Sequence, residues 1–242
     1  MRVIPVIDIL KGKAVHAKHG QREGYRPLKS ILCETPDPVE VAQAYQSAFG
    51  FEEIYMADLD SITKGEMNLG LLRRIPLESN LRVMVDAGVD TLEKAECLID
   101  EGASKVIVGT ETLHEISDLT RILDGLGRDL VIVSLDAMGG TIISKSKELN
   151  GLRPEDAAKK MEAFGVEEII FLELSRVGGE RGAATEDISR VVKQVALSVI
   201  VGGGVRDIDD LFVLRDLGVS GVLVATALHN GMIRREDLRL LE

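Results

Sequence analysis

Residues 197–228 read LSVIVGGGVRDIDDLFVLRDLGVSGVLVATAL, and this stretch decides the fold. An apolar, β-branched run ends in the three glycines Gly202 to Gly204, and a helical pattern follows. A second apolar run, residues 221–224, then ends in the small residues Ala225 and Thr226. The pattern predicts a strand, a glycine-rich turn, a helix and a second strand. Free amides of such a turn beside a helix N-terminus suit an anion such as phosphate, although a plain tight turn would show the same glycines.

A similar pattern occurs earlier in the chain, so the sequence contains an internal repeat. Residues 81–113, LRVMVDAGVDTLEKAECLIDEGASKVIVGTETL, align with the first stretch at a constant offset of 116 residues. The chain is therefore one half-unit written twice, which we divide at about residues 1–124 and 125–242. Two further segments return in the second half: AFGFEEIYMADL (48–59) as AFGVEEIIFLEL (163–174), and VIPVIDILKG (3–12) as VIVSLDAMGG (131–140).

The composition fits one large α/β domain. With 242 residues, 45% of them hydrophobic, the chain can bury a large core, and α/β barrels reach this size as one domain. No apolar run approaches the length of a membrane span, and the N-terminus lacks the features of a signal peptide. The two cysteines, Cys33 and Cys97, have no motif spacing, so we expect free thiols in a cytoplasmic protein. A net charge of −11 argues against nucleic-acid binding.

Short apolar runs alternate with helical patterns along the chain. Besides the two strands quoted first, we expect strands at residues 3–8, 53–58, 81–85, 105–108, 130–135 and 168–172. Helices are expected between these strands, at residues 37–50, 67–74, 91–101, 116–123 and 154–164, then up to about residue 195 and at the chain end. Residues 10–30 and 138–153 are expected to be polar connections. Eight such units in two equal halves favour a TIM (β/α)8 barrel over an open doubly wound sheet.

Asp8 and Asp136 occupy equivalent positions at the ends of the first and fifth predicted strands. In a (β/α)8 barrel these two strands face each other, and chemistry gathers at the carboxyl ends of the strands. Two opposed carboxylates suit a catalytic acid and base, whereas a single aspartate at a strand end is more often a cap or a turn residue. Asp58, Asp86 and Glu173 end three other strands, so we expect a rim of carboxylates that shift one another's pKa values or hold a cation.

Other polar residues are weaker candidates. His16 and His19 share a polar loop and lack a third ligand, which favours solvated side chains over a metal site. His114 and His229 lie just after equivalent strands, so the pattern favours turn residues over catalytic ones. The cations of the first long loop, which either fold over a substrate phosphate or stay solvated, are Lys18, Arg22 and Arg26.

Four features together are similar to those of a known family. The VIPVID start, the SLDAMGG segment at mid-chain, the VGGGVRD turn and the duplicated half-barrel resemble the histidine-biosynthesis barrel family, and the resemblance covers the whole chain. That family includes phosphoribosylformimino-aminoimidazole carboxamide ribotide isomerase and the cyclase subunit of imidazole-glycerol-phosphate synthase. The opening IDILKGKAV is more similar to the isomerase. The resemblance implies a cofactor-free Amadori rearrangement of an aldose to a ketose, with Asp8 and Asp136 as the acid and the base in an order left open.

The resemblance also implies two phosphate sites, one in each half of the barrel. The second-half residues that match the pattern are Gly203, Gly204, Ala225 and Thr226. Gly179 is a further candidate, in the loop after the sixth strand, where the sequence departs from the family. Those that remain in the first half are Gly88, Gly109 and Thr110. There, Asp86 and Ala87 replace the first two glycines of the triplet, and Asp90 replaces a basic residue. Because a carboxylate repels a phosphate, we expect this first site to be weakened, moved or lost.

Three hypotheses follow. The first is an isomerase of the histidine pathway or close to it. The second is a paralogue acting on a different, singly phosphorylated metabolite, because Leu172 stands where the family has a threonine and Lys147 where the isomerase has a substrate-stacking aromatic. An amine or a cation would then balance the acidic rim. The third is a non-catalytic barrel that retains one phosphate site. For the isomerase we expect a small phosphorylated metabolite as ligand, no cofactor, no metal, no nucleic-acid or membrane partner, and a monomer or a homodimer.

Overall fold

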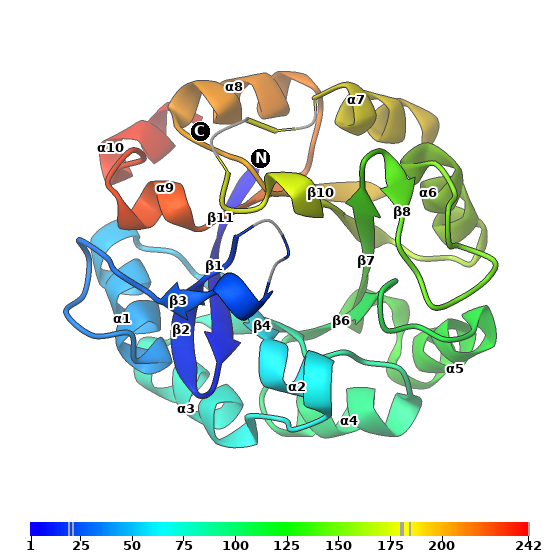
Figure 1. Ribbon diagram of the computed structural model, residues 1–242, viewed down its shortest axis with the longest axis horizontal. Helices are drawn as coiled ribbons and strands as arrows, with labels where there is room; N and C mark the ends of the chain where they lie inside the picture. The colour runs from blue at the N-terminus through cyan, green and yellow to red at the C-terminus, as the bar shows by residue number, and fades with distance from the viewer. Residues whose placement is uncertain (19, 21, 180–181, 184, 242) are drawn as a thin grey trace.

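A computed structural model describes residues 1–18, 20, 22–179, 182–183 and 185–241. In this part of the chain, eight parallel strands form a closed barrel, and helices surround it (Figure 1). Closure is direct, because the last strand pairs in parallel with the first, Arg2 to Pro5 lying opposite Gly221 to Val224. The predicted TIM (β/α)8 barrel is confirmed.

The ring order of the strands brings the two halves of the chain face to face. The barrel strands, in ring order, are β1 (Arg2–Leu10), β4 (Glu53–Asp58), β5 (Arg82–Asp86), β6 (Lys105–Gly109), β7 (Val131–Met138), β9 (Glu168–Glu173), β10 (Ser198–Gly202) and β11 (Gly221–Val224). Strand β7 is equally far from β1 in either direction around the ring. Side chains at the ends of β1 and β7 therefore approach the barrel mouth from opposite sides.

The helices lie outside the strand ring (Figure 1). They are α1 (Pro38–Phe49), α2 (Leu59–Lys64), α3 (Leu69–Ser79), α4 (Leu92–Asp100), α5 (Ile116–Leu126), α6 (Pro154–Ala163), α7 (Thr185–Gln194), α8 (Ile208–Asp216), α9 (Thr226–His229) and α10 (Arg235–Leu238). Short 3-10 helices are η1 (Arg22–Gly24), η2 (Arg128–Leu130), η3 (Leu174–Arg176) and η4 (Arg239–Leu241). None of the described helices is long and apolar enough to cross a membrane.

Helix α1 forms where its sequence signals predict it. The Asp37 side chain accepts hydrogen bonds from the amides of Val39 and Glu40, which caps the first turn. Pro38 fits the first position because its missing N–H has no partner there in any helix. Gly50 ends the helix in the left-handed conformation, with φ 77°.

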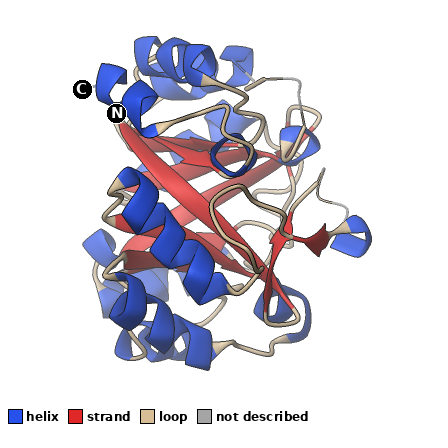
Figure 2. Ribbon diagram, turned by 90° about the vertical axis from the view of Figure 1, so that its left-hand side faces the viewer, coloured by secondary structure: helices blue, strands red, loops and turns tan. Residues whose placement is uncertain are grey.

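Both segments expected to be polar connections contain strands, which corrects that expectation. Lys11 and Gly12 take positive φ values of 53° and 69°, and this tight turn folds β1 back onto an antiparallel strand. The added strands, which project beyond one end of the barrel in Figure 2, are β2 (Lys13–His16), β3 (Arg26–Pro27) and β8 (Thr141–Ile142). They extend the sheet above the carboxyl ends of β1 and β7.

The barrel interior is packed with side chains. One buried inward residue comes from each barrel strand: Ile4, Tyr55, Met84, Ile107, Ile132, Ile170, Ile200 and Leu223. A second, larger apolar cluster lies between the sheet and the helices. The barrel is therefore a filled core, and ligands are limited to its two ends.

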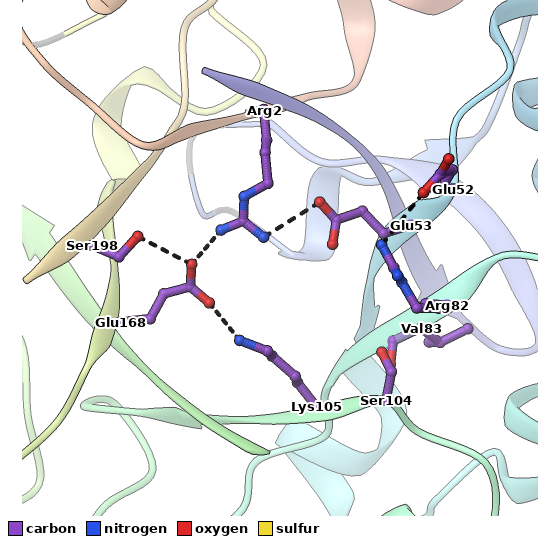
Figure 3. Close-up of polar contacts among 9 residues, drawn as sticks. All are labelled: Arg2, Glu52, Glu53, Arg82, Val83, Ser104, Lys105, Glu168 and Ser198. Carbon is purple, nitrogen blue, oxygen red and sulfur yellow. Dashed lines mark hydrogen bonds and ion pairs between the residues drawn. The ribbon is translucent and has the colours of Figure 1, made fainter. Parts of the chain in front are cut away.

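Charged side chains close the end of the barrel where the strands begin (Figure 3). Glu168, the first residue of β9, accepts hydrogen bonds from Arg2, from Lys105 at 2.8 Å and from the Ser198 hydroxyl at 3.3 Å. Arg2 also pairs with Glu53 at 3.4 Å. We call Arg2, Glu53, Lys105 and Glu168 the lower ion cluster. Each of its charges has an opposite charge in contact, so this end of the barrel is electrically balanced.

Candidate active site

Asp8 and Asp136 line one cavity at the carboxyl end of the barrel. Asp8 comes from β1 and Asp136 from β7, and the cavity has a volume of about 270 Å³. Tyr55, Asp86 and Glu111 line the same space. The two aspartates proposed from sequence thus face a common space from opposite strands of the ring.

A second cavity, of about 110 Å³, adjoins the first and reaches the glycine-rich turn after β10. All five residues predicted to bind phosphate in the second half line this cavity: Gly179, Gly203, Gly204, Ala225 and Thr226. The residues that border both cavities are Asp8, Ala17, Tyr55, Leu172 and Val177. Because Asp8 borders both, one ligand can extend from the glycine-rich turn to Asp136.

Burial and neighbouring negative charges raise the pKa values of both aspartates to near neutral pH. Burial, followed by the charge of Asp86, raises the pKa of Asp8 to about 7. Burial, followed by the charges of Glu111 and Asp86, raises the pKa of Asp136 to about 8. Loss of water disfavours the charged carboxylate, and nearby negative charges add to that effect. Carboxyl groups with such pKa values can give or take a proton at neutral pH.

Asp136 is held firmly, whereas Asp8 is left open. The Ser134 hydroxyl donates to Asp136 Oδ1 at 2.9 Å, and the buried Thr110 hydroxyl donates to Oδ2 at 3.3 Å. The Asp136 amide in turn donates to Thr110 Oγ1 at 3.0 Å. Among the described residues, no donor reaches the Asp8 carboxylate. The oxygens of Asp8 are therefore available to a ligand.

The second-half turn presents open backbone amides to its cavity. Gly203 and Gly204 adopt positive φ values of 96° and 83°, which few other residues tolerate. A Cβ on Gly204 would lie 2.5 Å from the Gly182 carbonyl oxygen, so only glycine fits there. Within the described chain, the amides of Gly203, Gly204, Ala225 and Thr226 have no hydrogen-bond partner. We call these four residues the amide cradle; open N–H groups of this kind are the usual backbone ligands of an anion.

Gly179 differs from the other predicted phosphate ligands. It lines the same cavity, but its amide donates to the Arg176 carbonyl at 3.0 Å. Arg176 itself packs against the cradle, because a Cβ on Gly204 would lie 3.4 Å from the Arg176 Cβ. The loop after β9 thus forms a wall of the cradle, and the Arg176 guanidinium donates to the Gly182 and Ala183 carbonyls at 3.0 and 3.5 Å.

The first-half phosphate candidates lie away from both cavities and bind the protein's own groups. The Gly88 amide donates to Asp86 Oδ1 at 3.2 Å, and its carbonyl accepts from Lys94 Nζ at 2.9 Å. The Thr110 amide donates to the Ser134 carbonyl at 2.9 Å. A Cβ on Gly109 would lie 3.5 Å from Asp136 Oδ2. Gly88, Gly109 and Thr110 therefore surround the protein's own carboxylates.

Two members of the predicted acidic rim are caps, which corrects that part of the expectation. Asp58 accepts hydrogen bonds from the amides of Ser61 and Asn68 at 3.1 and 2.7 Å, and Glu173 accepts from the amide and hydroxyl of Ser175 at 3.2 and 2.7 Å. Neither lines a cavity described above. Of the three extra acids, Asp86 alone faces the site, where burial raises its pKa to about 6 against the opposing hydrogen bond from Gly88.

Comparison with known proteins identifies the family. A family model described as histidine biosynthesis protein matches residues 2–234. The chain belongs to this family. A relative from Alkaliphilus metalliredigens is 32% identical over 99% of this chain and 98% of its own length, and one from Methanococcus maripaludis is 30% identical over 98% of each. Both are named 1-(5-phosphoribosyl)-5-((5-phosphoribosylamino)methylideneamino) imidazole-4-carboxamide isomerase. An uncharacterized protein of Methanocaldococcus jannaschii is 34% identical over 98% of this chain and 97% of its own length.

His229 of this family member has a structural role. His229 is buried, and its Nε2 and Nδ1 lie 2.6 Å from the Tyr45 hydroxyl and 2.9 Å from Ser30 Oγ. Because the Tyr45 hydroxyl donates to the Val6 carbonyl at 3.0 Å, it accepts from His229, which fixes the tautomer. Burial, followed by the charge of His16, lowers the pKa of His229 to about 4, so the ring is neutral. The network ties α1 and α9 to β1, so His229, the last residue of α9 rather than a turn residue, has a structural role.

Of the other histidines, His16 lines the smaller cavity together with Asp8, and His114 lines neither cavity. His16 Nε2 lies 3.1 Å from the Lys29 carbonyl, and His19 is outside the described residues. His114 lies 3.5 Å from Lys145 Nζ. Within the described part of the chain, no group of three or more His, Cys, Asp or Glu side chains is arranged to hold a metal ion.

Arg22 brings the first long loop over the site. It pairs with Glu111, and both residues line the cavity that contains Asp8 and Asp136. The sequence offered two interpretations of this loop, a solvated charged run or a segment that folds over the ligand. The ion pair favours the second for Arg22, although the partner in contact is a carboxylate of the protein itself.

Sequence reasoning missed Tyr55 and Glu111. Tyr55 is the inward residue of β4, and its hydroxyl donates to Asp86 Oδ2 at 3.1 Å. Glu111 follows β6, and its charge raises the pKa of Asp136. Strand alternation would have placed Tyr55 inside the barrel, whereas the inward direction of Glu111 depends on its pairing with Arg22 from a distant loop.

Proposed function

We propose that this protein catalyses the cofactor-free rearrangement of a phosphorylated ribosylamine into an aminoketose, with Asp136 as the acid and Asp8 as the base. One observation carries the proposal: Asp8 and Asp136, on opposite strands, line a common cavity that adjoins the amide cradle. Family membership and the isomerase name of two relatives support the reaction class. The cradle supplies the phosphate site that such a substrate requires.

The higher pKa of Asp136 and the open carboxylate of Asp8 support this order of roles. With a pKa of about 8, Asp136 holds its proton at neutral pH and can give it to the ring oxygen. The C1–O bond then breaks while the nitrogen lone pair forms a C1=N bond. Asp8, with a pKa of about 7, is partly ionised and lacks a hydrogen-bond donor among the described residues, so it can remove the C2 proton. The electrons of that C–H bond form C1=C2 and neutralise the iminium nitrogen.

The second stage restores both carboxyl groups. Asp8 returns its proton to C1, and the C2 hydroxyl loses its proton to Asp136 as the C2=O bond forms. Substrate and product are isomers, so no oxidant or reductant is consumed. The reaction needs two proton carriers on the same substrate, which is what two aspartates on one cavity provide.

The test is turnover by the purified protein on two ribosylamines. One is the substrate for which the relatives are named, and the other is the glycosylamine formed from aniline and ribose 5-phosphate, with conversion followed by NMR. We expect the wild type to form an aminoketose from at least one of them and Asp8→Asn to lose about 10³-fold in kcat. Ser117→Asn, at an exposed position outside both cavities, is the control. Absence of turnover on both compounds, or an Asp8→Asn variant as active as the wild type, would overturn the proposal.

A further inference from the structure

The two halves of the site exchange a small and a large residue at equivalent register positions. In the β4–β5 pair Ala57 lies opposite Asp86, and in the β9–β10 pair Leu172 lies opposite Gly202. A Cβ on Gly202 would lie 2.8 Å from Leu172 Cδ1, so the space that the Asp86 side chain uses in the first half is filled by leucine in the second. The small side chain of Ala57 therefore leaves space for the Asp86 side chain at the barrel mouth.

The backbone at these turns differs as well. In the second half Gly203 takes a φ of 96°, whereas Ala87 at the equivalent position does not adopt a positive φ. The amides of Gly203 and Gly204 are open, but the Gly88 amide, the counterpart of Gly204, is bound to Asp86. The first-half turn thus lacks the conformation that exposes two successive amides, because the Gly88 amide already has a carboxylate partner.

The charged residues that line the two cavities also favour a phosphate at the second-half end only. The first-half cavity is lined by Asp8, Asp86, Glu111 and Asp136, and among the described residues Arg22 is the one Lys or Arg that lines it. That arginine is already paired with Glu111. At the second end, Asp8 is the one Asp or Glu among the described residues that line the cavity, and the amides of the cradle have no partner in the described chain. A phosphate dianion is therefore repelled at one end and held at the other.

We propose that the substrate carries a single phosphoryl group, bound at the amide cradle, and that its other end is uncharged or cationic and presents hydroxyl or amine donors toward Asp86 and Asp136. This inference specifies the substrate of the proposed function, and the identity of the reaction rests on that proposal. The single phosphate site can be tested by binding alone, without the reaction. The ligand lies with its phosphate between β10 and β11 and its reacting carbons beside Asp8, which borders both cavities.

Binding of simple phosphates tests the inference without turnover. Inorganic phosphate, ribose 5-phosphate and ribulose 1,5-bisphosphate are titrated into the wild type by calorimetry. We expect one phosphate per chain, and a bisphosphate that binds no more tightly than ribose 5-phosphate. Two intact cradles would instead make the bisphosphate at least tenfold tighter, because its second phosphate would bind at a high effective concentration. Two phosphates per chain, or that tenfold gain, would overturn the inference.

Three variants, one of them a control, assign the observed binding to one end. Thr226→Asp adds a carboxylate at an exposed cradle residue, and we expect phosphate affinity to fall at least tenfold. Ser117→Asp adds the same charge at an exposed position in the first turn of α5, outside both cavities, and should change affinity less than about twofold. Asp86→Asn should strengthen bisphosphate binding relative to ribose 5-phosphate. Unchanged phosphate affinity in Thr226→Asp would contradict the assignment.

The two proposals fail separately. If no ribosylamine is converted but one phosphate binds at the cradle, the reaction is wrong and the single-phosphate inference stands. If conversion occurs and the bisphosphate binds at least tenfold more tightly than ribose 5-phosphate, the reaction stands and the single-phosphate inference is wrong.

Discussion

Both ends of the barrel contain charged side chains, but these are paired with opposite charges at one end and largely unpaired at the other. At the end where the strands begin, each charge of the lower ion cluster contacts an opposite charge, and Glu168 has both Arg2 and Lys105 (Figure 3). At the carboxyl end, Asp8, Asp86 and Asp136 share a cavity whose described lining offers Arg22 as its one Lys or Arg. Paired charges serve the fold, whereas unpaired carboxyl groups have raised pKa values that cost stability and suit proton transfer.

The largest contrast is expected in turnover. Asp136→Asn removes the proposed acid at the carboxyl end, and we expect kcat to fall about 10³-fold. Glu168→Gln, in the lower ion cluster, should leave kcat within about threefold, because in a (β/α)8 barrel the chemistry lies at the opposite end. Steady-state kinetics on the converted ribosylamine measure both. A comparable loss of kcat in the two variants would remove the distinction between the ends.

The next contrast concerns pH. Activity should rise as Asp8 loses its proton near pH 7 and fall as Asp136 loses its proton near pH 8, which gives a narrow bell in kcat/KM. Glu111→Gln removes a charge that raises the pKa of Asp136, so the basic limb should move to lower pH by roughly half a unit or more while the acidic limb stays. Asp86 raises the pKa of both aspartates, so Asp86→Asn should move both limbs. If neither limb of the kcat/KM profile moves in either variant, groups other than Asp8 and Asp136 control the pH dependence.

Stability should change with opposite signs at the two ends. The folded pKa of Asp136 is raised from 3.8 to about 8, so stability is full below the lower value and is lost as pH rises through the higher one. At pH 9 we therefore expect Asp136→Asn to raise the free energy of unfolding by about 1–3 kcal/mol. Glu168→Gln leaves Arg2 and Lys105 without their partner and should lower it by about 1–3 kcal/mol. Urea unfolding at pH 6 and pH 9 tests both; a destabilised Asp136→Asn at pH 9 would contradict the account.

The smallest effect is expected from an exposed pair beside the lower ion cluster. Arg82 and Glu52 lie 3.7 Å apart, with side chains 64% and 84% exposed (Figure 3). Arg82→Ala should change the free energy of unfolding by less than about 0.5 kcal/mol, because exposed pairs are screened and cost side-chain entropy. The same urea experiment measures it. A loss as large as that of Glu168→Gln would show that burial is not what distinguishes the cluster.

The sequence alone predicts the architecture because the repeat carries strong local signals. The apolar runs, the helix caps such as Asp37, and the closing glycines each act within a few residues, so strand and helix positions follow directly. The symmetry of Asp8 and Asp136 in the repeat then indicates opposed strand ends. The hairpin after β1 is missed because β2 has only four residues and depends on a turn at Lys11 and Gly12.

The site is predicted less completely, for a physical reason. Strand-end acids look alike in sequence, yet Asp58 and Glu173 bend back to cap their own loops while Asp86 points into the cavity. Which of these occurs depends on the neighbouring strand, since Ala57 leaves the room that Asp86 fills. The pairing of Arg22 with Glu111 joins two distant loops, and no local pattern indicates it.

Hydrogen exchange into the aminoketose product tests the division of labour between Asp8 and Asp136 most directly. In D2O, the wild type should exchange a C1 hydrogen of the product with solvent. Asp136→Asn should slow this exchange less than Asp8→Asn does, because the amide that replaces the carboxyl group can still donate a hydrogen bond to the C2 carbonyl while Asp8 removes the C1 proton. Asp8→Asn should lose it. Exchange at the wild-type rate in Asp8→Asn would contradict the account.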